Sequence, residues 1–179
     1  VYGGAAQGAI NSGSYALTAS GKTSANYDIT YVPGTLTIGK ASLTATAANV
    51  SRTYDGLAYA GGGGVVYDGF VNSETSAVLG GTLTYTGTSQ GAKNVGSYGI
   101  TPEGLSSANY AITYVPGTLT VNKATLVVTA AADTKTYDGL AHSGGNGVSY
   151  AGFVNNETEL VIGGTVSYAG TSQGAVAVG

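Results

Sequence analysis

The sequence predicts an all-β protein made of tandem, small β-sandwich-like (immunoglobulin-like) modules, with β-grasp-like modules as the alternative. Three observations support this fold class: a long internal repeat, an unusual composition, and short stretches of alternating apolar and polar residues. Residues 107–123 repeat residues 24–40 almost unchanged, and the same spacing of 83 positions relates the rest of the chain to itself without a gap. A period of this length indicates tandem modules.

The composition favours strands and excludes several classes of site. The chain has 31 Gly, 14 Tyr and no Cys, and its charged residues amount to 8%, against roughly 25% in ordinary globular domains. Thr, Val and Tyr suit half-buried strands. Zero Cys excludes disulfides, thiolate catalysis and Cys-ligated metals. A net charge of −3 argues against a nucleic-acid partner, and no apolar run approaches the roughly 20 residues that span a membrane.

Within residues 41–123 the signals are almost all for short strands at roughly ten-residue spacing, as in a sandwich. Pro116-Gly117 suits the central positions of a type II turn, with a wider loop as the alternative. Residues 74–79 form the one helical candidate, of one or two turns, with Glu74 near its N-terminus. The predicted strands are residues 43–47, 52–54, 65–67, 82–86, 97–101, 110–115 and 118–122.

The natural boundaries lie after Lys40 and Lys123. Residues 41–123 are then a complete module, residues 1–40 the C-terminal part of a preceding one, and residues 124–179 the N-terminal part of the next. The joints contain no Gly/Ser or Pro spacer, so we expect short, stiff connections. Two partial modules leave strand edges uncovered, so we expect the chain to continue or neighbouring subunits to supply the missing strands.

Strand parity and the repetition predict the core of the complete module. Residues at alternate positions of a strand face the same side, and tyrosine can bury its ring while its hydroxyl stays hydrogen-bonded. The predicted core residues are Tyr54, Tyr67, Phe70, Tyr85, Ile100, Ile112 and Leu119.

Recurring short motifs carry a family resemblance. They occupy residues 53–57, 69–75, 80–82, 95–98 and 107–121, and include Tyr54-Asp55-Gly56. In this order the motifs resemble the YDG and MBG repeat families of bacterial filamentous-haemagglutinin-like exoproteins and large adhesins. The resemblance implies an extracellular, all-β stalk or adhesive repeat of a long secreted protein, without catalytic residues.

The repeat-signature residues are interpreted as structural. Asp after Tyr suits a turn because its side chain can accept from nearby backbone N–H groups. This interpretation is preferred to a calcium site, which needs several oxygen ligands together. The signature residues are Tyr54, Asp55, Gly56, Tyr137, Asp138, Gly139, Tyr110, Tyr114, Pro116 and Gly117.

Other suggestive patterns do not carry chemistry. Gly21-Lys22-Thr23 lacks the upstream glycine and the following helix of a phosphate-binding loop. His142 is the only histidine, and Tyr59 replaces it in the other copy. Lys40 and Lys123, with Asn26 or Asn109 and Glu74 or Glu157, supply the residue types of a Lys–Asn isopeptide bond without further evidence for one. We therefore expect no catalytic, cofactor-binding or metal-binding residue.

The predicted function is structural: a stalk, spacer or fibre-forming segment of a long secreted bacterial surface adhesin or extracellular filament. The alternative is a ligand-binding adhesive module for glycans or a host surface. The expected partners are adjacent copies of the chain itself, with a host or neighbouring cell surface as a further candidate. The expected location is extracellular, at the bacterial cell surface, with no membrane span and no nucleic-acid partner.

Overall fold

The computed structural model describes residues 1–176, which divide into two compact units. The first unit comprises residues 1–50, 59–91 and 97–119, and the second comprises residues 51–58, 92–96 and the chain from residue 120. The predicted modules 1–40, 41–123 and 124–179 are called the N-terminal, central and C-terminal repeats below. These module boundaries remain a prediction.

The described residues form strands joined by turns, with two 3₁₀ turns and no α-helix, so the all-β prediction is confirmed. The 3₁₀ turns are η1 (Ser76–Val78) and η2 (Glu159–Val161). The strands are β1 (Tyr2–Gly3), β2 (Gly13–Ala19), β3 (Gly34–Ile38), β4 (Ala41–Ala47), β5 (Val50–Thr53), β6 (Val65–Asp68), β7 (Gly80–Thr86), β8 (Gly96–Ser106), β9 (Tyr110–Val115), β10 (Gly117–Asn122), β11 (Val127–Ala130) and β12 (Val148–Ala151).

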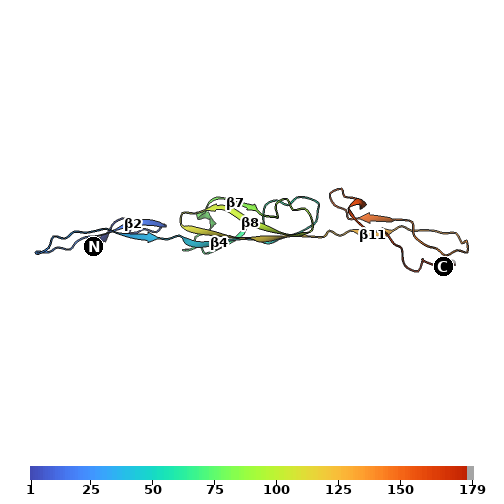
Figure 1. Cartoon of the computed structure of the whole chain (residues 1–179), viewed down its shortest axis with the longest axis horizontal. Helices are drawn as coiled ribbons and strands as arrows, with labels where there is room; N and C mark the ends of the chain where they lie inside the picture. The colour runs from blue at the N-terminus through green and yellow to red at the C-terminus, as the bar shows by residue number, and fades with distance from the viewer. Residues whose placement is uncertain (177–179) are drawn as a thin grey trace. The chain divides into compact units, whose positions relative to one another are not determined.

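The central repeat contains two sheets, of strand order β6-β4-β9 and β5-β10-β8-β7. Figure 1 shows β4 on one side of this repeat and β7 and β8 on the other, as in a sandwich. β4 pairs with β6 antiparallel and with β9 parallel, in a register that runs from Ala41↔Tyr110 to Thr46↔Val115. A parallel pair needs a long crossover, and here the chain between β4 and β9 supplies β5 to β8.

The core of the central repeat lies on alternate residues of these strands. Leu43 and Ala45 of β4 are completely buried, and so are Ile100 and Leu119. Of the predicted core, Ile100 and Leu119 are thus fully buried, whereas Tyr54, Tyr67, Phe70, Tyr85 and Ile112 are half-buried. The predicted list omitted the buried face of β4, which consists of Leu43, Ala45 and Ala47.

The N-terminal repeat forms a three-stranded sheet of order β1-β2-β3. By the 83-residue spacing these strands correspond to β7, β8 and β10. Residues 27–32 form no strand, although their sequence is nearly that of β9. Tyr27 is 79% exposed, whereas its counterpart Tyr110 is 2% exposed. β9 is a strand because it pairs with β4, and no described residues pair with 27–32.

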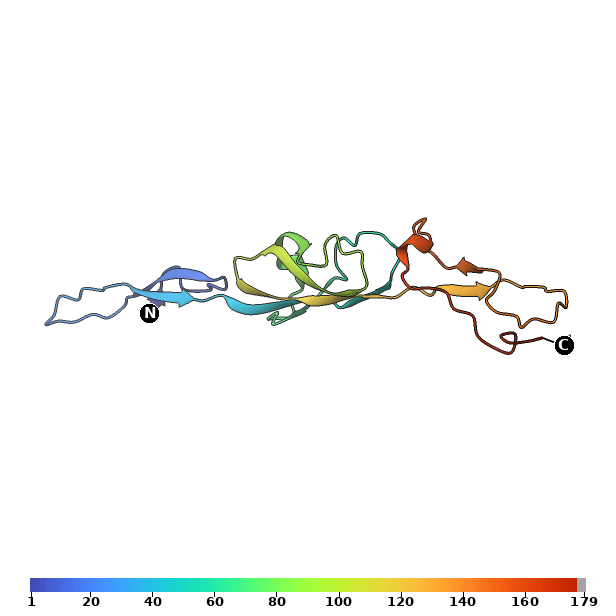
Figure 2. The ribbon, with the colours of Figure 1, turned by 45° about the vertical axis from the view of Figure 1, so that its right-hand side comes forward.

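In the C-terminal repeat β11 pairs with β12 antiparallel, from Val127↔Ala151 to Ala130↔Val148. Figure 2 shows these two strands together with η2. They correspond to β4 and β6. Residues 133–136 and 163–169, the counterparts of β5 and β7, form no strand, and the described residues contain no counterpart of their partners β10 and β8 for this repeat.

Two local predictions were wrong. Gly117 is not a positive-φ glycine, so Pro116-Gly117 is not a type II turn. The chain instead passes from β9 of one sheet to β10 of the other at this point. The helical candidate is reduced to η1, which Thr75 caps by accepting from Ala77 N. Glu74, expected near the start of this helix, instead accepts a hydrogen bond from Tyr110 Oη.

Candidate junctions between repeats

The Tyr-Asp-Gly motif forms the same turn in both described copies. Asp55 Oδ1 accepts from the backbone N–H of Leu57 at 2.9 Å, and Asp138 Oδ1 accepts from that of Leu140 at 3.0 Å. The glycine that follows has φ of 73° in Gly56 and 77° in the second copy, a conformation that glycine adopts without strain. The aspartate therefore shapes the turn in both copies.

A cation stands beside each of these aspartates. The N–H of Leu57, and then the Arg52 guanidinium, hold the pKa of Asp55 below its ordinary value. For Asp138 the larger effect comes from the Lys135 ammonium, 2.7 Å away, which lowers the pKa of the carboxyl. Both neighbouring cations thus favour the ionised form of the carboxyl that accepts in the turn.

The first copy of this turn is packed against the C-terminal repeat, within the second unit. Asn155 Nδ2 donates to Gly56 O at 3.3 Å, and a Cβ on Gly56 would lie 2.6 Å from Asn155 Cβ. Tyr54 Oη donates to Glu157 Oε1, and this bond to a carboxylate raises the pKa of Tyr54. In the second copy, Tyr137 is 67% exposed. The turn is therefore a contact surface for the next repeat.

Tyr110 occupies a socket in the central repeat. Its hydroxyl donates to Glu74 and accepts from Val71 N at 3.1 Å. Its ring meets Phe70 edge-to-face, with centroids 5.4 Å apart and planes at 81°, a favoured geometry for aromatic pairs. The bond to Glu74 raises the pKa of Tyr110. Tyr110 thus joins β9 to the segment before η1.

Tyr114 closes the connection between β8 and β9. Its hydroxyl accepts from Leu105 N at 2.7 Å and donates to Leu105 O at 3.0 Å. The counterpart Tyr31 makes the same two bonds to Lys22, at 2.6 and 3.1 Å. This closure is therefore local and does not depend on a paired β9.

Pro116 and Gly117 mark the change of sheet. Gly117 is buried, and a Cβ there would lie 2.6 Å from Ala47 O and 2.7 Å from Ala48 O. The next amide, of Thr118, donates to Asn49 Oδ1 at 2.8 Å. Gly117 is required for close approach to the end of β4 rather than for a turn.

A second junction, within the first unit, joins the N-terminal repeat to the loop 107–109 of the central repeat. Asn109 Oδ1 accepts from Ser12 N at 2.9 Å, and Asn109 Nδ2 donates to Asn11 Oδ1 at 2.9 Å. Ser12 Oγ donates to Ala108 O at 2.7 Å. Polar groups of residues far apart in sequence therefore bridge two consecutive repeats.

The same loop holds a lysine and is itself ordered. Lys40 Nζ donates to Ser107 O at 2.8 Å. Ser107 Oγ accepts from the backbone N–H groups of Asn109 and Tyr110, both at 3.1 Å. The lysine and asparagine considered for an isopeptide bond thus lie at this junction, where each is engaged in hydrogen bonds. The sequence offered no signal for this site, because the counterpart of Ser12 is Val95.

A comparison with protein-family models decides the family. The model of the MBG domain (YGX type) matches residues 2–37 and 43–120. The chain belongs to the MBG domain family. A search of curated proteins and a search of solved structures gave no match. MBG domains are structural or adhesive repeat domains of large secreted surface proteins.

A cavity of about 210 Å³ lies near the Tyr54–Glu157 contact, within the second unit. Most of its walls are apolar. The counterparts of Phe153 and Glu157 in the central repeat are Phe70 and Glu74, which hold Tyr110. The cavity therefore lies at the socket that Tyr110 fills in the central repeat. The lining residues are Tyr54, Val95, Lys123, Ala124, Leu126, Gly152, Phe153, Val154, Glu157, Val161 and Ile162.

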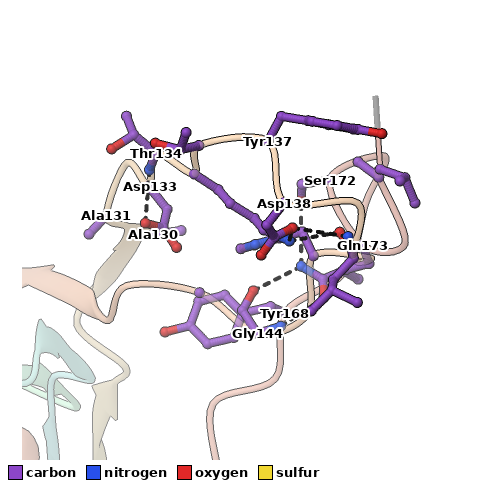
Figure 3. A pocket seen from close by; sticks show the side chains of 18 residues that line it. Ala130, Ala131, Asp133, Thr134, Tyr137, Asp138, Gly144, Tyr168, Ser172 and Gln173 are labelled. Carbon is purple, nitrogen blue, oxygen red and sulfur yellow. Dashed lines mark hydrogen bonds and ion pairs between the residues drawn. The ribbon is translucent and has the colours of Figure 1, made fainter. Parts of the chain in front are cut away.

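A larger cavity, of about 470 Å³, lies beside the second Tyr-Asp-Gly turn, in the C-terminal repeat (Figure 3). Its wall includes Asp138, His142 and Tyr168. Gln173 closes one side through bonds to both backbone groups of Gly144, at 3.0 and 2.9 Å. Gln90 makes the same pair of bonds in the central repeat, so this feature belongs to the framework.

The described residues also bear on a metal site and on a membrane span. Among residues 1–176 no group of three or more His, Cys, Asp or Glu side chains is placed to hold a metal ion. No helix formed by these residues has the length and apolar character needed to span a bilayer.

Proposed function

We propose that this chain is a spacer segment in the stalk or fibre of a long secreted bacterial surface protein. It carries load and sets reach, and it performs no reaction. Its partners are adjacent repeats of the same kind. The single observation that supports this most strongly is the hydrogen-bonded junction between the N-terminal and central repeats.

The junction is short as well as bonded. Two residues separate the end of β3 at Ile38 from the start of β4 at Ala41. Four side-chain hydrogen bonds join Asn11, Ser12 and Lys40 to the loop 107–109. Each such bond contributes about 0.5–1.5 kcal/mol net. Together they oppose bending at the connection, which is the property a spacer needs.

The placement of aromatic rings favours a spacer over a glycan-binding module. A repeated binding site requires exposed rings at the same position in each copy. Tyr137 is 67% exposed, but its counterpart Tyr54 is half-buried and bonded to Glu157. Tyr85 and Tyr168 are half-buried in both copies, and each ring lies over a glycine, Gly62 or Gly145. Tyr54, Tyr85 and Tyr168 therefore serve packing.

A binding screen separates the two functions. The purified 179-residue chain is applied to a glycan array and to host-cell surfaces, with Tyr137→Ala as the variant that removes the most exposed ring of the larger cavity. The spacer function predicts no saturable binding by either protein. Saturable binding by the native chain that Tyr137→Ala abolishes would establish the adhesive function instead.

A further inference from the structure

We propose that strand β9 of the central repeat is a pairing edge, and that it binds β9 of a second copy of this chain, antiparallel and about a two-fold axis. The contact lies within residues 110–115. It goes beyond the spacer function, because it joins two stalks side by side instead of joining repeats along one chain.

Four strands of the central repeat lie at sheet edges. The orders β6-β4-β9 and β5-β10-β8-β7 place β6, β9, β5 and β7 there. All four belong to residues 41–123, which cover one whole period of the repeat, so every strand of this repeat is present around them. A sheet edge carries a row of backbone N–H and C=O groups that can pair with another chain.

Three of these edges carry a feature that opposes pairing. Charged side chains and an irregular register are common ways in which proteins protect an edge. Asp68 is exposed on β6, and Arg52 lies on β5. The register of β7 against β8 shifts between Gly81 and Thr84.

β9 lacks both kinds of protection. It reads Tyr-Ala-Ile-Thr-Tyr-Val, without a charge, a glycine or a proline. Its register against β4 runs unbroken from Ala41↔Tyr110 to Thr46↔Val115. Uncharged segments of high strand preference at a sheet edge are the ones that pair with a further chain. β9 is therefore the edge of this repeat best suited to a partner strand.

Side-chain burial shows that the outer side of β9 is open. Ile112 stands beside Leu43 in the register, on the core side of the sheet. Leu43 is completely buried, but Ile112 is only half-buried. On the other face of the strand Ala111, Thr113 and Val115 are exposed.

The backbone of β9 directs alternate residues toward β4 and away from it. Ala41 N donates to Asn109 O at 2.9 Å, so Asn109 faces β4. Every second residue from there, 111, 113 and 115, therefore also faces β4, and the residues between them face outward. The outward N–H of Tyr110 is bonded to Ser107 Oγ. The N–H groups of Ile112 and Tyr114 point to the open side.

A two-fold axis at Thr113 brings these outward groups of two copies together. It sets Ile112 of each copy opposite Tyr114 of the other, and such a pair exchanges both N–H···O bonds. It also sets Ala111 opposite Val115, so exposed side chains meet exposed side chains on one face. The product is a continuous sheet of order β6-β4-β9-β9-β4-β6.

A two-fold contact requires the absence of charge that β9 shows. About such an axis each strand meets its own sequence, so a charge at the axis would face its like, and like charges directly opposite destabilise a sheet. Thr113 instead meets Thr113, a pair whose hydroxyls can bond across strands. Val115, which is 38% exposed, is covered by Ala111 of the second copy.

Sedimentation velocity over a range of concentrations tests the proposal. The native chain should form dimers. Thr113→Lys places two like charges at the axis and should weaken dimerisation more than about tenfold, because like charges that face each other across an interface are strongly unfavourable. Thr30→Lys adds the same charge at the equivalent, exposed position of the N-terminal repeat and should dimerise like the native chain. Circular dichroism checks that both variants are folded.

A disulfide test reports the register and decides the matter if Thr113→Lys is unfolded. The chain has no Cys, so Thr113→Cys introduces the only thiol. Thr113 forms a non-hydrogen-bonded pair with itself, with Cα atoms about 4.5 Å apart, which a disulfide can bridge. Oxidation should therefore link two copies of Thr113→Cys. Ala111→Cys should not link, because the axis separates its two copies by about 13 Å along the strands.

Three results would overturn the lateral contact. They are a native chain that stays monomeric at its highest soluble concentration, a dimer that Thr113→Lys leaves intact, and equal crosslinking by Thr113→Cys and Ala111→Cys. Each of these leaves the spacer function untouched, because that function depends on contacts along one chain. The two proposals can therefore fail separately.

Discussion

At the scale of single residues, a tyrosine hydroxyl bonded to a glutamate recurs in both units. Tyr110 donates to Glu74, and Tyr54 donates to Glu157. Glutamates are few in this chain, and two of them serve tyrosines that come from distant segments. The pairing holds segments in register with little charge, which suits a protein with 8% charged residues.

The pKa of Tyr110 reports this contact. The hydrogen bond to Glu74 raises that pKa above the ordinary 10.0. The contact therefore stabilises the fold fully below about pH 10 and is lost as pH rises through the raised pKa. Glu74→Gln should lower the pKa of Tyr110, measured by NMR of ring-labelled tyrosine, and Glu103→Gln on the exposed part of β8 should not. An unchanged pKa in Glu74→Gln would refute the assignment.

The equivalent glycines Gly117 and Gly34 differ in how closely their surroundings approach them. A Cβ added at Gly117 would lie 2.6 Å from Ala47 O. A Cβ added at the counterpart Gly34 would lie 3.9 Å from its nearest neighbouring atom. Gly117→Ala should destabilise the central repeat by about 1–3 kcal/mol, as overpacking does. Gly34→Ala should change stability by less than about 0.5 kcal/mol. Hydrogen exchange of the β4 and β10 amides measures the effect of Gly117→Ala, and exchange of the β2 and β3 amides measures that of Gly34→Ala. Equal effects would contradict the close approach.

At the scale of elements, the partner decides whether a segment becomes a strand. Residues 27–32 and 110–115 have nearly one sequence, yet β9 is a strand and 27–32 is not. Strand preference expresses packing against neighbours more than an intrinsic backbone tendency. The sequence therefore predicts a strand for both segments. It does not reveal that residues 27–32 have no strand partner among the described residues.

Hydrogen exchange tests this dependence on a partner. In dilute, monomeric solution the amides of residues 110–115 should exchange slowly, because β9 pairs with β4. The amides of residues 27–32 should exchange fast. Equal protection of the two segments in dilute solution would mean that the strand forms without a partner.

Particular residues mark how far sequence analysis reaches. Residues 110–115 were predicted as a strand and form β9, because alternation and β-rich composition are local signals. The predicted type II turn at Pro116-Gly117 is wrong. Gly117 is needed because its backbone passes close to Ala47 O, and Ala47 is remote in sequence. The bond from Ser12 to Asn109 spans 97 positions and joins residues of different repeats. Neither a local sequence pattern nor the repeat spacing predicts such a contact.

At the scale of the whole molecule, the chain consists of similar repeats joined by hydrogen-bonded junctions. The repeats share one framework, and the central repeat contacts its neighbours through a polar loop, residues 107–109, and through the Tyr-Asp-Gly turn at residues 54–56. Side chains with few charges make these contacts, so ionic strength should affect the junctions little. A spacer with such junctions keeps its reach in varied surroundings.

We infer that the junction in the first unit is stiff, and the spread of the distance between its two repeats reports that stiffness. Spin labels on Ser14→Cys in β2 and Thr84→Cys in β7 occupy exposed strand positions of a chain without other thiols. Double electron–electron resonance should give one narrow distance distribution, which Asn109→Ala broadens because it removes the bonds to Ser12 and Asn11. A distribution in the native chain as broad as that of a flexible linker would contradict the account.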